Sequence, residues 1–281
     1  TAQTSACYRH IHIMGFTVAS YSLLVFLGFL AFVILTYIAF TRFEKVTRET
    51  RIRLLLVSVV SFAAMAASAW LFDLIFFSIE AGKLTAGGIT WLGSVAGGFP
   101  TAIFLIHKCV PEAKGRTLYF FSLMMPGIVL AHALGRVGCF LGGCCYGQVT
   151  DSIFGVSFPA GSAAAHQFPA ADGRSLPVLP TQLFEAVFEL IICIVMLAGR
   201  KKWKNYNLEI WCFAYGVFRF IMEFFRADSR GGTGFFLTPS QLLSVCLWIA
   251  GVLLILFKRG RIFKKLYAQG EVWREQVRVD K

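Results

Sequence analysis

Residues 16–40 read FTVASYSLLVFLGFLAFVILTYIAF, an apolar run without a single charged side chain. About 20 such residues are enough for a helix to cross the hydrocarbon core of a bilayer. The rest of the chain agrees, since 57% of its 281 residues are hydrophobic and only 15% are charged. A soluble globular domain of this composition would have too little polar surface to cover its core. The sequence therefore predicts an integral membrane protein.

Further apolar windows of similar length follow along the chain. We predict an all-α protein with seven transmembrane helices, at about residues 16–40, 54–79, 88–107, 118–137, 179–198, 208–226 and 238–257. Alternate connectors are basic, and most of the 27 Lys and Arg residues lie in 41–53, 108–117, 199–207 and the tail from Lys258. By the positive-inside rule these connectors are cytoplasmic, which puts the N-terminus outside and the C-terminus inside.

The net charge of +12 follows from this topology and from contact with anionic headgroups. We expect no nucleic-acid partner, because basic side chains interleaved with base-reading groups on one face are missing. Residues 1–15 carry no short apolar core, so we expect no cleavable signal peptide. The economical domain organisation is a single polytopic membrane domain, 1–281, with an extracytoplasmic loop at 148–178 and a basic cytoplasmic tail at 258–281.

The segment 132–147, HALGRVGCFLGGCCYG, places polar and reactive groups at the outer end of the fourth window. His132 and Arg136 are four residues apart and share one helix face. An imidazole and a guanidinium at a membrane boundary suit an anionic headgroup, because a guanidinium binds phosphate through two parallel hydrogen bonds. His132 would serve as a base for a thiol or as an acid for a leaving group.

Cys139, Cys144 and Cys145 leave several chemistries open. Their predicted place on the oxidising side favours a disulfide or another redox role. A thiolate beside Arg136 and His132 would instead have a lowered pKa and act as a nucleophile. We expect no metal site, because adjacent cysteines cannot easily bind one ion together. The remaining cysteines in or beside apolar windows are expected to be packing residues: Cys109, Cys193, Cys212 and Cys246.

Three other windows carry polar groups. In the sixth, Arg219, Glu223 and Arg226 are spaced to form a charged ladder on one helix face, which favours a polar cavity over a purely structural network. The fifth and seventh open with PTQL at 180–183 and PSQL at 239–242, two helix starts whose dipoles favour an anion, although ordinary capping explains the same pattern.

The motifs GRVGCF, GGCCYG, PTQLFEAVFE and FRFIMEFFRAD with TPSQLLS, in this order, resemble the prolipoprotein diacylglyceryl transferase family of bacterial inner-membrane enzymes. The resemblance implies transfer of the diacylglyceryl moiety of phosphatidylglycerol, or a related anionic phospholipid, to a thiol, with a lipoprotein precursor as the acceptor and no cofactor. It implies catalytic roles for Arg136, Arg219 and Glu223, and we add His132, Cys144 and Cys145. Substrate contacts are expected from Tyr21, Cys139, Gly147, Gln182, Glu185, Arg226 and Gln241.

Two departures from the family pattern concern the chemistry itself. Cys139 and Cys144 stand where the family signature has an asparagine and a carboxylate, and Leu92 stands where the family has a histidine regarded as catalytic. His132 is our candidate for the missing imidazole. Three alternatives stay open: a thiol-redox membrane protein that uses the three cysteines, a lipid transferase with a covalent cysteine intermediate and another acceptor, and a transporter or lipid-binding protein on the same scaffold.

Overall fold

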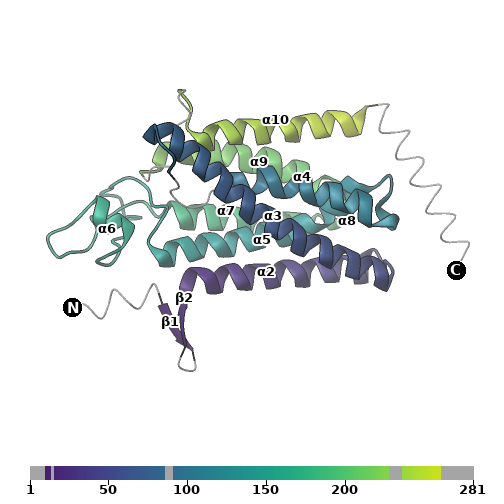
Figure 1. Ribbon diagram of the computed structural model, residues 1–281, viewed down its shortest axis with the longest axis horizontal. Coiled ribbons are helices and arrows are strands. Elements are labelled where there is room, and N and C mark those ends of the chain that lie inside the picture. Colours follow the sequence, from purple (N-terminus) through teal and green to yellow (C-terminus); the bar gives the residue numbers. More distant parts are fainter. Residues whose placement is uncertain (1–9, 14–15, 86–90, 228–235, 261–281) are drawn as a thin grey trace, which may run out of the picture. The chain divides into compact units, whose positions relative to one another are not determined.

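The computed structural model of the protein describes residues 10–13, 16–85, 91–227 and 236–260 (Figure 1). A two-stranded antiparallel hairpin precedes the helices, and a helix then overlaps each of the seven predicted windows. The elements are β1 (His10–Ile13), β2 (Phe16–Ala19), α2 (Ser20–Ile38), α3 (Arg48–Ala81), α4 (Trp91–Cys109), α5 (Thr117–Gly142), α6 (Ala163–Gln167), α7 (Thr181–Ala198), α8 (Arg200–Trp203), α9 (Asn207–Met222) and α10 (Pro239–Arg259). Short π- and 3₁₀-helical turns lie at Ala39–Phe43, Pro111–Ala113, Lys204–Tyr206 and Glu223–Phe225.

The hairpin corrects the all-helical prediction at one point. Residues 16–19 form β2, so α2 begins at Ser20, four residues later than its window. Val18 and Thr17 are β-branched and favour a strand. Five of the helical segments that the structure describes are long and apolar enough to cross a membrane: Ser20–Phe43, Arg48–Ala81, Thr117–Gly142, Thr181–Ala198 and Pro239–Leu256. The protein is therefore a helical membrane protein.

The chain forms two compact units, and the division falls inside α2, α5 and α9. Unit 1 contains Thr1–Leu35, Pro126–Ala198 and Ile221–Ser229, and unit 2 contains Thr36–Met125, Gly199–Phe220 and Arg230–Lys281. The basic tail beyond residue 260 lies outside the described residues.

In unit 1, α2 and α5 pack closely through glycines. A Cβ atom on Gly28 would lie 2.9 Å from the carbonyl oxygen of Ala131, and one on Gly127 would lie 3.0 Å from that of Phe32. Side chains at these positions would force the helices apart, which is the ordinary reason for small residues between membrane helices. This contact fixes the half of α5 that carries His132 and Arg136.

The loop between α5 and α7 is folded around a small core of its own. Phe158, Ala164 and Val178 are buried together with Tyr146, and the Tyr146 hydroxyl donates a 2.6 Å hydrogen bond to Oε1 of Gln167. Isolated bridges such as that between Val156 and Val178 tie the two sides of the loop together. The loop is therefore a packed element beside the end of α5.

In unit 2, α3 and α4 pack closely through glycines of α4. A Cβ on Gly97 would collide with Ser68, and the hydroxyl of Ser68 donates a 2.9 Å hydrogen bond to the carbonyl of Gly93. Gly93 and Gly97 are four residues apart on one face of α4, and both lie against Ser68 of α3. Capping limits α3 at both ends, since the Thr47 hydroxyl accepts from the amide of Thr50 and Gly82 takes the left-handed conformation with φ of 64°.

Candidate functional site

Two pairs of polar side chains from α5 and α7 meet inside unit 1. His132 and Arg136 lie on α5, Glu185 and Glu189 lie on α7, and all four are buried. Nδ1 of His132 is 2.7 Å from Oε1 of Glu189, and its Nε2 is 3.5 Å from Oε1 of Glu185. Arg136 Nη2 is 2.6 Å from Oε2 of Glu185. We call these four residues the buried polar cluster.

The cluster follows from helix geometry. Residues four apart lie on the same helix face, so each helix presents two polar groups to its neighbour. Buried charges are costly unless they are paired, and a polar group inside a membrane helix is by default a functional hypothesis. A guanidinium offers five N–H donors, so the Arg136 side chain can bind more than one partner at once.

Glu189 was missed by the sequence reasoning. Its signal was present, because Gln182, Glu185 and Glu189 are spaced three and four residues apart in an otherwise apolar helix and all three are almost fully buried. A polar stripe of this kind on a membrane helix should have been assigned as a unit. It pairs directly with His132.

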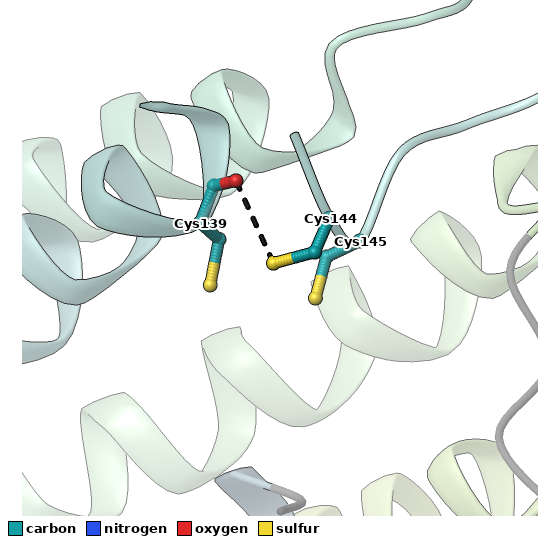
Figure 2. A group of neighbouring side chains, drawn as sticks. All are labelled: Cys139, Cys144 and Cys145. Carbon is teal, nitrogen blue, oxygen red and sulfur yellow. Dashed lines mark hydrogen bonds between the residues drawn. The ribbon is translucent and has the colours of Figure 1, made fainter. Parts of the chain in front are cut away.

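The three cysteines at the end of α5 form a second cluster. The sulfur atoms of Cys139, Cys144 and Cys145 all lie within 4.8 Å of one another, and in Figure 2 the sulfur of Cys144 lies between the other two. Nη1 of Arg136 donates to the sulfur of Cys139 at 3.8 Å, which joins this cysteine cluster to the buried polar cluster. All three cysteines are free thiols.

The expected lowering of the thiol pKa is wrong for Cys144. Hydrogen bonds with Cys139 and then with Cys145, followed by burial, raise the pKa of Cys144. The thiols face each other at close range, so ionisation of one is opposed by its neighbours. The Cys144 thiol instead donates a 3.6 Å hydrogen bond to the carbonyl of Cys139.

The first turn of α7 holds residues 143–148 in place. These residues follow α5, include Cys144 and Cys145, and are called the cysteine loop. The side-chain amide of Gln182 donates a 2.6 Å hydrogen bond to the carbonyl of Cys144, and the Thr181 hydroxyl donates a 2.8 Å bond to that of Cys145. Gly147 donates its amide to the carbonyl of Leu179 at 2.8 Å. Thr181 and Gln182, which the sequence marked as a helix start, therefore bind protein backbone.

Gly147 is confined on all sides. A Cβ atom there would lie 2.6 Å from the carbonyl oxygen of Phe225 and 2.8 Å from side-chain atoms of Leu179 and Thr181. Gly147 also forms an antiparallel bridge with Arg226. The glycine that closes the signature motif is thus explained by close backbone packing.

The prediction that Arg219, Glu223 and Arg226 share one helix face is wrong in part, because the α-helix ends before Glu223. Helix α9 ends at Met222, a 3₁₀ turn covers Glu223–Phe225, and Arg226 is extended with φ of −88° and ψ of 152°. The backbone of this stretch bonds to the cysteine loop instead, since the amide of Gln148 donates to the carbonyl of Phe225 at 2.9 Å. Arg226 is buried but does not continue the face that carries Arg219.

Two predicted site residues belong to unit 2. Arg219 is buried and donates a 3.0 Å hydrogen bond to the Ser240 hydroxyl at the start of α10. Gln241 and Thr238 form a capping box, in which each side chain accepts from the backbone amide of the other at 3.2 Å. Capping therefore accounts for Gln241, and the catalytic role of Arg219 stays a prediction.

Tyr21 lies in unit 1, in the first turn of α2. Its ring carbon Cδ2 would be 3.2 Å from a Cβ atom on Gly138, two residues along α5 from Arg136. The side chain is 36% exposed, so it borders the buried groups without being enclosed. Leu92 is buried in α4 of unit 2, where the sequence noted the missing histidine.

Comparison with known proteins shows which family the chain belongs to. The family model described as prolipoprotein diacylglyceryl transferase matches residues 9–257. The chain belongs to the prolipoprotein diacylglyceryl transferase family. Residues 132–147 and the first turn of α7 both fall inside the matched region.

Individual family members are moderately similar to this chain. A Clostridium perfringens protein named phosphatidylglycerol--prolipoprotein diacylglyceryl transferase 2 is 36% identical over 169 residues, which are 59% of this chain and 61% of the relative. Two relatives named phosphatidylglycerol--prolipoprotein diacylglyceryl transferase come from Clostridium tetani, at 30% identity over 64% of this chain and 68% of the relative, and Xanthomonas oryzae, at 33% over 63% of each. The matches thus span about three fifths to two thirds of these relatives.

Proposed function

We propose that this protein transfers the diacylglyceryl moiety of phosphatidylglycerol to the thiol of a cysteine in a lipoprotein precursor and releases glycerol phosphate. The observation that carries the proposal is the family match over residues 9–257. The names of the bacterial relatives supply the donor and the acceptor class. The buried polar cluster adds a guanidinium that suits the phosphate of the donor.

The proposed setting is the bacterial plasma membrane. All seven helices would span it, α4 and α9 included, with the N-terminus outside and the C-terminus cytoplasmic. The basic connectors support this orientation through the positive-inside rule. Residues 148–178 would then be extracytoplasmic, residues 258–281 would form the cytoplasmic tail, and the chain would act as one polytopic domain.

Arg136 is the proposed phosphate ligand. Its guanidinium, which lies 2.6 Å from Glu185, would contact the leaving phosphate, where hydrogen bonds strengthen as charge develops. Arg219 is proposed as the second cationic contact, held by Ser240. His132 is proposed to transfer a proton at the reacting groups, with Glu189 fixing its ring.

The remaining assigned residues are proposed to shape the substrate region. Tyr21 and Arg226 would border the bound lipid, and Glu223 would balance the charge of the arginines. Gln182 and Gly147 would act indirectly, by holding the cysteine loop against α7.

The test uses purified protein in detergent with phosphatidylglycerol and a synthetic peptide that carries one cysteine in a lipoprotein signal context. We expect the peptide to gain the mass of one diacylglyceryl group and glycerol phosphate to appear in equal amount. A peptide with serine in place of the cysteine should stay unmodified. Absence of lipidated peptide with folded protein and saturating lipid would remove the proposal.

A thiol-redox function is the second candidate, because three sulfur atoms within 4.8 Å can exchange disulfides. Counting free thiols before and after reduction decides between the two. A redox protein would cycle between three free thiols and one disulfide with its partner, and lipid transfer would not occur. A covalent lipid intermediate on Cys144 or Cys145 would appear as a mass adduct on the protein itself.

A further inference from the structure

The cysteine cluster has the dimensions of a metal site. A tetrahedral ion with Zn–S bonds of about 2.3 Å holds its sulfurs roughly 3.8 Å apart. The sulfurs of Cys139, Cys144 and Cys145 already lie within 4.8 Å of one another. Each pair of sulfurs would therefore need to approach by no more than about 1 Å to reach the spacing of zinc ligands.

The backbone removes the objection that adjacent cysteines cannot face one ion. Cys145 has φ of 64°, a left-handed conformation that a residue with a side chain rarely adopts. Gly143 is also left-handed, with φ of 66°, and ends α5 just before Cys144. These two turns bring both neighbouring thiols to the side of Cys139, as Figure 2 shows. Strain of this kind is found at functional sites.

Hydrogen bonds hold this strained loop in place. Gln182 binds the carbonyl of Cys144 and Thr181 binds that of Cys145, so the two thiols are carried by a backbone fixed to α7. Oε1 of Gln182 is buried and accepts no hydrogen bond from the residues that the structure describes. Fixing the backbone before a ligand arrives is what a preorganised site requires.

The local charges also favour a cation. Helix α5 ends at Gly142, so its partial negative charge is directed at the cluster. Three thiolates with one divalent cation carry a net charge of −1, and Arg136, 3.8 Å from the sulfur of Cys139, would balance it. Sulfur ligands select soft ions such as zinc over magnesium or calcium.

We propose that Cys139, Cys144 and Cys145 bind one Zn²⁺ ion and leave its fourth position open for the acceptor thiol. Three protein ligands with an open position are typical of catalytic zinc, whereas structural zinc is closed by four. This role rests on the proposed lipid transfer, but the metal site itself does not. It gives the three cysteines a function as ligands in place of a nucleophile.

The chemistry of thioethers favours this role over a covalent cysteine intermediate. Alkylation of a cysteine by the glyceryl carbon would give a dialkyl thioether, and a thiolate is a poor leaving group from a saturated carbon. The lipid would then stay on the enzyme. A zinc-bound acceptor avoids this step, because the acceptor sulfur attacks the donor directly.

The balanced reaction involves no electron transfer to the metal. The acceptor thiol loses its proton to water when it binds zinc. Its sulfur then forms a bond to the terminal glyceryl carbon as the bond from that carbon to the phosphate oxygen breaks. The electron pair leaves with glycerol phosphate, and zinc stays divalent.

Metal titration tests the site without reference to activity. Full-length protein, reduced and stripped of metal in detergent, is titrated with Zn²⁺ against a chromophoric chelator and with Co²⁺ by absorption. We expect one equivalent and a thiolate-to-cobalt charge-transfer band. Cys139→Ser, Cys144→Ser and Cys145→Ser should each bind at least about 10-fold more weakly, since even outer-shell losses have that effect. Cys109→Ser and Cys246→Ser are controls at exposed cysteines and should bind normally.

Either of two results would overturn the metal site: no uptake by the reduced protein, or equal binding by the triple serine variant. The open position has its own readout, because a single-cysteine acceptor peptide should shift the cobalt band and its serine version should not. Full transfer by metal-free protein would overturn the role of zinc and leave the proposed function standing. Stoichiometric metal binding without transfer under any condition would refute the proposed function while the site holds.

Discussion

Arg136 Nη2 and Glu185 Oε2 lie 2.6 Å apart, in an ion pair whose side chains are only 8% and 3% exposed. A buried pair of this kind contributes little net stability compared with apolar packing, but loss of one partner leaves an uncompensated charge. Its presence between two membrane helices is therefore better explained by function than by folding. The same guanidinium also reaches the sulfur of Cys139, so one side chain joins both clusters.

Arg136→Lys should separate phosphate binding from charge balance. Lysine keeps a cation beside Glu185 but lacks the planar fork that binds phosphate bidentately. We expect lipid transfer to fall about 100-fold, as for loss of one donor to a developing anion, with little change in the melting temperature. Arg174→Ala removes an exposed arginine of the same unit and should leave transfer unchanged. Wild-type activity in Arg136→Lys would exclude bidentate phosphate binding.

Glu189→Leu removes the acceptor of the 2.7 Å hydrogen bond from His132. Loss of one partner in a buried bond costs about 1–3 kcal/mol, and we expect the free energy of unfolding to drop by that amount. Glu189→Gln keeps an acceptor oxygen and should lose less. Chemical denaturation in detergent measures both. Equal losses in the two variants would mean that the charge of the carboxylate, which both variants remove, matters and the retained acceptor oxygen does not.

Gly147→Ala should destabilise unit 1, because the added Cβ would lie 2.6 Å from the carbonyl of Phe225. The cost of overpacking is typically about 1–3 kcal/mol. Gly135→Ala is a matched control on α5 with nothing within 4 Å of the added atom, and alanine there favours the helix. Thermal unfolding should therefore rank Gly135→Ala at or above wild type and Gly147→Ala below it. The reverse order would contradict the packing argument.

Lys204 should stabilise unit 2 up to alkaline pH. Burial lowers the pKa of Lys204, but its hydrogen bonds to Glu44 and Tyr119 and the charge of Glu44 outweigh this, so the pKa is raised above its ordinary 10.5. A raised pKa means that the stabilisation is complete below 10.5 and is lost as pH rises through the folded value. The Lys204 side chain is 37% exposed, so Lys204→Met should cost only about 0.2–1 kcal/mol at neutral pH.

Melting temperatures of wild type and Lys204→Met, followed from neutral to strongly alkaline pH, should therefore converge. Lys202→Met is the control, because that lysine is exposed in the same connector. A difference that stays constant at all pH values would show that the effect comes from lost packing of the lysine stem.

The sequence by itself determined the class of protein and the place of its helices. An apolar run that crosses a bilayer by itself must satisfy its backbone hydrogen bonds internally, as a helix does, and a helix overlaps each predicted window. Spacing also identified residues that share one face of a helix. It placed His132 and Arg136 together for the same reason.

Only the tertiary structure decided which groups from different helices meet. Helical periodicity says which residues share a face, but not which face of another helix it meets, so the pairing of His132 with Glu189 was not predictable. Backbone torsions were equally hidden, since no sequence signal predicted the left-handed conformation of Cys145. The end of α9 at Met222 was also fixed from outside the helix, because the following backbone bonds to the cysteine loop.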